Sequence, residues 1–149
     1  MFRTMQDFST EWTRESEQTA LLLDACTEES LHQRVAEGHW TLGEIAWHLV
    51  SSLHYITHLG LSFPAPNEEA STSAKTMAQE YRTISRELLH AVTTQWNEES
   101  LQETIELWGQ NWKKGEVLLF TIMHQAHHRG QMTVLMRQAG YAEIPPMFG

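Results

Sequence analysis

Apolar residues recur at helical spacing in four separate blocks of the chain, and strand patterns are almost absent. The blocks span residues 7–25, 41–59, 71–96 and 115–139. Each block is long enough to form a helix that buries one face against its neighbours. The blocks predict an all-α fold, a four-helix bundle, whose core can collect ligands from different helices. One domain, residues 1–149, accommodates all of them.

Local signals place the ends of these helices. Thr41 and Glu44 are spaced as a capping box at the start of the second block. Gly60 and the prolines of residues 63–66 end that block, so we expect a long, mainly extended crossover loop between the second and third helices. The poor pattern between residues 97 and 115 predicts an irregular segment before the fourth helix, with a helical turn at most. A non-helical tail follows the fourth helix.

The balance of charge argues against two classes of partner. The chain carries 10 Lys and Arg residues against 19 Asp and Glu residues, for a formal net charge of −9 with the histidines neutral. Such a chain repels the phosphates of nucleic acids and the anionic surface of membranes. We therefore expect neither nucleic acid nor membrane as a partner.

Nothing in the sequence predicts export. Cys26 is the single cysteine, so an internal disulfide cannot form. Residues 1–7 lack a basic start followed by an apolar run, and no segment approaches the ~20 apolar residues of a membrane span. A cytoplasmic location is the expectation.

Two of the nine histidines, His124 and His128, lie four residues apart inside the last apolar block. Helical residues at this spacing are about 40° apart around the axis with Cβ atoms roughly 5–6 Å apart, so both imidazoles can reach one ion. Two imidazoles leave a divalent ion underfilled, and His48, in the second block, is the best candidate for a third ligand. The sequence predicts a mononuclear metal site of His48, His124 and His128.

Other arrangements of histidines compete with this one. His54 and His58 are also four apart, but they lie about 120° and 80° from the direction of His48, and His58 is some 15 Å further along the helix. They are expected at the surface or at the mouth of a pocket. Two Glu-x-x-His segments, residues 29–32 and 87–90, have the spacing used by di-iron bundles. Neither falls on an apolar helical face, so both are expected to be solvated.

Several residues are candidates for roles around the ion. Glu44 lies one turn before the second-helix histidine and either orients that imidazole or only caps its helix. His127 points about 100° away from its neighbour in the pair, which predicts a place behind the ligands or on a dimer face. Arg129 and Gln131 follow the pair and are expected behind the ligands or in contact with a substrate or a partner subunit.

The chain also contains six tryptophans. Most of them are expected to anchor the core or an interface, because their large area dominates packing. Trp47 adjoins the second-helix histidine, and Trp108 and Trp112 lie in the irregular segment that leads into the fourth helix. Our hypothesis is that one or two of these three wall a pocket over the ion and so favour an apolar or aromatic substrate.

The run of residues 123–132, with its His-x-x-x-His pair, resembles the DinB family of metal-binding four-helix bundles. The position of His48 in the second helix and the tail at residues 140–149 resemble that family as well. The resemblance covers residues 7–149. It implies that the three histidines are the metal triad, that the ion is nickel or zinc, and that the protein is a homodimer. Some relatives are thiol-dependent transferases or isomerases, and many have no assigned reaction.

Three protein ligands with one position open is the pattern of a catalytic rather than a structural zinc site. A water bound there, with its pKa lowered toward ~7, can act as nucleophile or base, or a substrate thiolate can displace it. We expect a metal-dependent enzyme acting on a small molecule, either a hydrolase or a transferase that uses a low-molecular-weight thiol. The alternative is a non-catalytic metal-binding or stress-response module.

Overall fold

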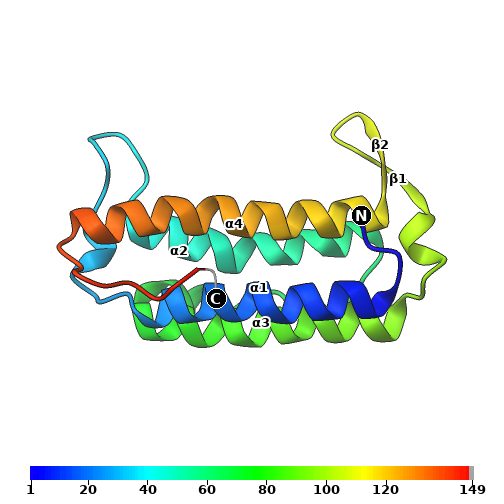
Figure 1. Ribbon diagram of the computed structural model, residues 1–149, viewed down its shortest axis with the longest axis horizontal. Helices are drawn as coiled ribbons and strands as arrows, with labels where there is room; N and C mark the ends of the chain where they lie inside the picture. The colour runs from blue at the N-terminus through cyan, green and yellow to red at the C-terminus, as the bar shows by residue number, and fades with distance from the viewer. Residues whose placement is uncertain (148–149) are drawn as a thin grey trace.

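A computed structural model describes residues 1–147 and shows four helices lying side by side (Figure 1). They are α1 (Met5–Asp24), α2 (Leu42–Ser51), α3 (Ala74–Gln95) and α4 (Lys114–Gln138). Helices α1 and α4 run in one direction and α2 and α3 in the other, because the crossover after α2 carries the chain back to the end where α2 began (Figure 1). Each of α1 and α2 packs against both α3 and α4. The expected all-α bundle is confirmed.

The apolar faces of the helices meet in one continuous core. Each large apolar side chain that is fully buried in this core stabilises the fold by about 1.5–3 kcal/mol. The indole of Trp12 also donates a hydrogen bond to the carbonyl oxygen of Ser85 at 3.0 Å, which joins α1 to α3. The largest fully buried side chains include Phe8, Trp12, Leu22, Leu42, Leu49, Leu53, Ile56, Met77, Tyr81 and Ile84.

Side-chain caps fix where α2 begins and a glycine fixes where its continuation ends. The Thr41 hydroxyl accepts from the amide of Glu44 at 3.1 Å, and the Glu44 carboxylate accepts from the amide of Thr41 at 2.6 Å, so the predicted capping box is confirmed. Beyond Ser51 the chain tightens into a 3-10 helix over Ser52–Leu59. Gly60, with φ of 90°, ends this helix, because a left-handed residue cannot continue it.

The crossover loop contains no helix or strand over residues 61–67 and then forms a short 3-10 helix over Glu68–Thr72. After α4, the expected non-helical tail is confirmed through Met147, while Phe148 and Gly149 lie outside the described residues. Within residues 1–147, no helix combines the length and the apolar character that crossing a membrane requires.

The segment before α4 is not the irregular loop that we expected. It contains a 3-10 turn at Ser100–Gln102 and then an antiparallel hairpin of β1 (Thr104–Leu107) and β2 (Gln110–Lys113). The two-residue turn between the strands has positive φ at both Trp108 (51°) and Gly109 (72°). Such turns favour Asn-Gly, and a bulky residue in the left-handed region costs about 1–2 kcal/mol. The sequence therefore lacked the usual hairpin signal.

Candidate metal centre

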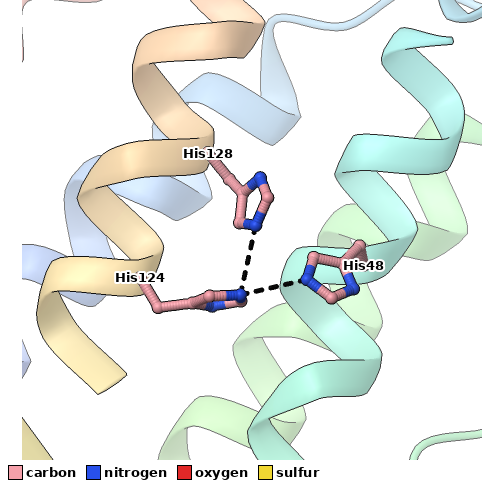
Figure 2. Close-up of side chains that lie close together, drawn as sticks. All are labelled: His48, His124 and His128. Atoms are coloured by element: carbon pink, nitrogen blue, oxygen red, sulfur yellow. Dashed lines mark hydrogen bonds between the residues drawn. The ribbon is translucent and has the colours of Figure 1, made fainter. Parts of the chain in front are cut away.

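Three histidine side chains meet between α2 and α4. His48 projects from α2, and His124 and His128 project from successive turns of α4 (Figure 2). The Nε2 atom of His124 lies 3.0 Å from Nε2 of His48 and 3.1 Å from Nε2 of His128. One nitrogen of each ring lies within 4.8 Å of those of the other two. The structure thus brings together the three residues that the sequence predicted.

These distances fit the donor set of a metal site. Nitrogens bound at roughly 2.0–2.1 Å lie about 3.3 Å apart around a tetrahedral ion and about 3.0 Å apart at neighbouring corners of an octahedral one. Hydrogen bonding alone fits less well, because Nε2 of His124 approaches two other ring nitrogens. A neutral ring nitrogen has either one hydrogen or one lone pair, so it cannot pair well with both.

The surroundings keep all three imidazoles uncharged. Burial, followed by the neighbouring His128 and His48, lowers the pKa of His124 to about 4. Burial and then His128 lower the pKa of His48. Burial also lowers the pKa of His128, although the hydrogen bond that His128 donates to Gln131 acts in the opposite direction. Neutral imidazoles are the form that binds a metal ion, so little proton release would accompany binding at neutral pH.

The lowered pKa values predict how stability depends on pH in the metal-free protein. Below the ordinary histidine pKa of about 6.5 the unfolded chain binds protons that the folded site resists, so acid favours unfolding. We expect the free energy of unfolding to fall as the pH drops from about 6.5 toward 4, with no contribution from these groups above pH ~7. Urea titrations across this range would measure it. Replacing His124 with Gln should flatten the curve, and an unchanged slope in that variant would contradict the prediction.

Gln131 orients one of the three candidate ligands. Its Oε1 atom lies 2.7 Å from Nδ1 of His128, and an amide oxygen can only accept. The Nδ1 atom therefore carries the hydrogen, and the lone pair of Nε2 is left to face the other two rings. Gln131 therefore lies behind His128, and it also lines a cavity beside that residue.

Replacing Gln131 with Leu is expected to weaken metal binding by about 10- to 100-fold, the usual cost of losing a partner of a metal-bound imidazole. The affinity can be measured by competition with a chromogenic chelator. Gln138→Leu is the matched control, because Gln138 is exposed at the far end of the same helix. Equal affinities of the two variants would show that Gln131 does not orient His128.

Two other candidates have simpler roles. The Glu44 carboxylate is exposed and bonded to the backbone of Thr41, which is the capping role. His127 is also exposed, with its ring centroid 5.0 Å from that of His128 and tilted by 73°. It lies beside the three histidines and outside the group of converging nitrogens.

Arg129 is not available to a substrate or to a partner subunit, so that expectation was wrong. The side chain is 3% exposed. Its guanidinium pairs with the Glu15 carboxylate and donates to the Glu15 carbonyl oxygen at 3.1 Å and to the Thr19 hydroxyl at 3.0 Å. Adjacent residues on a helix point about 100° apart, so Arg129 faces α1 while His128 faces α2.

A second buried network stands directly behind the site, and sequence reasoning missed it. Gln125 accepts a hydrogen bond from the Tyr81 hydroxyl at 3.0 Å and donates one to the carbonyl oxygen of Leu49 at 3.2 Å. Gln125 follows His124 and Leu49 follows His48, so this amide ties α4 to α2 beside two of the three histidines. A glutamine on an otherwise apolar helix was the available signal.

Four other histidines, His32, His54, His58 and His90, stay apart from the centre, as expected. His54 contacts the carbonyl oxygen of Phe63 at 3.2 Å, and His58 contacts that of Tyr55 at 3.0 Å. The histidines of the two Glu-x-x-His segments are exposed. In the part of the chain that the structure describes, the three converging histidines form the only group of three metal-type donors.

A cavity of about 600 Å³ opens beside His128. Trp40 stands at its edge, with its ring centroid 5.1 Å from that of His48 and 6.4 Å from that of His128. Sequence reasoning did not select Trp40, because it lies in the break before α2. Trp47 packs against the core instead of walling the site. The other lining residues are Val35, Gly38, His39, Ile45, Gln131, Val134 and Leu135.

Fold and site together define a helical bundle with a cluster of three histidines between two of its helices. The chain belongs to the DinB family, whose sequence profile matches residues 1–148. Uncharacterized protein YrdA of Bacillus subtilis (strain 168) is 45% identical over 152 residues, covering 100% of this chain and 90% of YrdA. The family resemblance found in the sequence is confirmed.

Solved structures agree with this assignment. The crystal structure of a DinB-like protein from Bacillus cereus ATCC 10987 superimposes with a TM-score of 0.89 at 40% identity, covering 99% of this chain and 100% of that chain. The DinB-like protein YjoA of Bacillus subtilis gives a TM-score of 0.75 at 18% identity over 95% of this chain and 96% of that chain. The second comparison supports the fold alone.

Proposed function

We propose that the protein is an enzyme that uses one divalent metal ion, held by His48, His124 and His128, to act on a small molecule. One observation carries the proposal: three ring nitrogens converge within 4.8 Å of one another, and no fourth His, Cys, Asp or Glu of residues 1–147 joins them. A site closed by a fourth protein ligand would instead favour a structural role. Zinc or nickel is the proposed ion.

The surrounding side chains have distinct tasks in this proposal. The three neutral imidazoles bind the ion, and Gln131 fixes the orientation of His128 through its 2.7 Å contact. A divalent ion held there would act as a Lewis acid for the reacting group. Trp40 and the cavity beside His128, whose lining is mainly apolar, bind the apolar part of the substrate and exclude water. Pockets of this kind commonly bind small organic ligands.

Two reactions suit this arrangement, namely hydrolysis and transfer to a low-molecular-weight thiol. The mainly apolar lining of the cavity supports both equally, because each needs an organic substrate held beside the ion. A homodimer and a cytoplasmic location belong to the same proposal.

Metal content and turnover test the proposal together. Tag-free protein should contain close to one equivalent of zinc or nickel by elemental analysis. The loaded protein should then either hydrolyse chromogenic esters or amides, or transfer an electrophilic dinitrophenyl group to a small thiol. Turnover should disappear in His124→Ala. Stoichiometric metal without either reaction would favour a metal-binding module, and absence of metal would remove the proposal.

A further inference from the structure

A second surface adjoins the histidines on the side of the β1–β2 hairpin. Phe120 lies one turn before His124 on α4, with ring centroids 6.1 Å apart. Its ring contacts those of Trp108 at 5.5 Å and Trp112 at 6.2 Å. Trp108 in turn lies flat against Tyr55, with centroids 5.3 Å apart and an interplanar angle of 4°. We call this set, together with Ser52, the hairpin surface.

The hairpin surface continues the metal site along both helices. Ser52 and Tyr55 follow His48 by four and seven residues, and Phe120 precedes His124 by four. These spacings place residues on one face of a helix. The 3-10 helix that begins at Ser52 keeps Ser52 and Tyr55 on the same side, because its repeat is three residues.

Three polar atoms of this surface have nothing to bond to. The Ser52 hydroxyl, the Tyr55 hydroxyl and the Trp112 indole N–H are shielded from solvent and have no hydrogen-bond partner among the described residues. Outside the hairpin surface only the Gln18 Oε1 atom shares this condition in residues 1–147. Buried polar groups are nearly always paired in folded proteins. Because these atoms are shielded from solvent, a ligand reaches them only when neighbouring side chains, such as the exposed Trp108 stacked on Tyr55, move aside. Three unpaired groups within this one set of residues therefore indicate a place for a polar group.

The hairpin turn supplies an independent observation. Trp108 occupies the left-handed region with φ of 51°, where Asn or Gly is the usual residue, and its side chain is 60% exposed. A large exposed indole in a strained conformation is poor for folding, and such strain concentrates at ligand-binding sites. The turn holds this indole over Tyr55, at the open edge of the hairpin surface.

We propose that the hairpin surface binds a carbonyl-type oxygen on a flat group of the substrate, next to the metal centre. An indole N–H can only donate a hydrogen bond, and both hydroxyls can donate, so the ligand must supply an acceptor oxygen. The aromatic side chains favour a flat, conjugated group that packs against them. The identity of the reacting group rests on the proposed function, whereas binding to the hairpin surface does not require the ion.

Matched aromatic probes test this inference by ligand-observed NMR on the metal-free and the zinc-loaded protein. Benzamide and benzoate carry acceptor oxygens, benzylamine carries only a donor, and toluene carries neither. At least one of the two acceptors should bind about 10-fold more tightly than benzylamine and toluene. The benzamide and benzoate arms separate a neutral carbonyl from a carboxylate. Equal binding of toluene and both acceptors would overturn the proposal.

Deleting single atoms sharpens the test. Tyr55→Phe and Ser52→Ala should each weaken binding of the preferred acceptor by about 3- to 10-fold, the range for one hydrogen bond. Neither should lower the melting temperature, because these hydroxyls have no partner in residues 1–147. Binding that stays within about 2-fold in both variants, well below the loss of a hydrogen bond, would overturn the proposal.

Tyr141→Phe is the matched control. The Tyr141 hydroxyl donates to the carbonyl oxygen of Ala25 at 2.7 Å and contacts Ser30, so its loss should lower the melting temperature and leave probe binding unchanged. The two proposals can also fail separately. A protein that binds the acceptor probe and no metal would refute only the proposed function, and one that binds metal and not the probe would refute only the hairpin surface.

Discussion

Replacing His124 with Ala is expected to weaken metal binding by more than about 100-fold. This is more than the loss usually caused by removing a residue that only hydrogen-bonds a metal ligand. His124 is the central member of the three, because its Nε2 atom lies 3.0 Å from that of His48 and 3.1 Å from that of His128. The two remaining nitrogens cannot hold a divalent ion firmly by themselves. Elemental analysis and chelator competition on the purified variant would measure the loss.

His127→Ala is the matched control for this experiment. His127 is exposed, lies on the same helix and carries the same ring, but it is outside the converging group. The control should bind metal with an affinity within about 3-fold of the parent, a smaller change than removal of a hydrogen-bond partner of a metal ligand would cause. Circular dichroism should show the same helix content in both variants, because neither substitution removes a large apolar side chain. Stoichiometric metal in His124→Ala would defeat the assignment of the three ligands.

Helical periodicity was sufficient to predict the parts of the structure that are local in sequence. The capping box at Thr41 and the shared direction of His124 and His128 depend on residues three or four positions apart. A divalent ion needs more than two ligands, and His48 could be selected as the third by its place in the middle of the second helix, although its partner His124 is 76 residues away. The family resemblance supported the same choice.

The features that the sequence did not reveal depend on distant partners. Arg129 was expected behind the ligands or near a substrate or a subunit, but its ion pair with Glu15 was not foreseen, because Glu15 is 114 residues away. Gln125 bridges Tyr81 and Leu49, which are 44 and 76 residues away. The hairpin was missed for a different reason. Its strands are four residues each, too short for a clear alternation, and Trp108 occupies a turn position where Asn is usual.

The buried residues directly after the histidines link the geometry of the site to the stability of the bundle. Arg129 follows His128 and is fixed to α1, and Gln125 follows His124 and is fixed to α2 and α3. The same turns of α4 therefore present ligands on one side and anchored polar groups on another. A change that frees Arg129 should disturb the folding of the protein as well as the position of His128.

Glu15→Ala is accordingly expected to lower the free energy of unfolding by about 3–5 kcal/mol, because it leaves the Arg129 guanidinium buried without a counter-charge. Glu15 and Arg129 are 7% and 3% exposed, so water cannot replace the lost carboxylate. Urea unfolding of the metal-free protein would measure the change. Glu17→Ala, on the same helix, should lower the free energy of unfolding by less than about 1 kcal/mol, because Glu17 and Arg82 form an ion pair at the surface.

The paired substitution Glu15→Leu with Arg129→Met separates a missing counter-charge from a general packing defect. It replaces both charges with apolar groups, so most of the stability lost in Glu15→Ala should return. Without the anchor to α1, metal affinity should stay about 10-fold or more below that of the parent, as it does when other residues that hold a metal ligand in position are removed. A Glu15→Ala variant no less stable than Glu17→Ala would show that the buried ion pair does not hold α4 against α1.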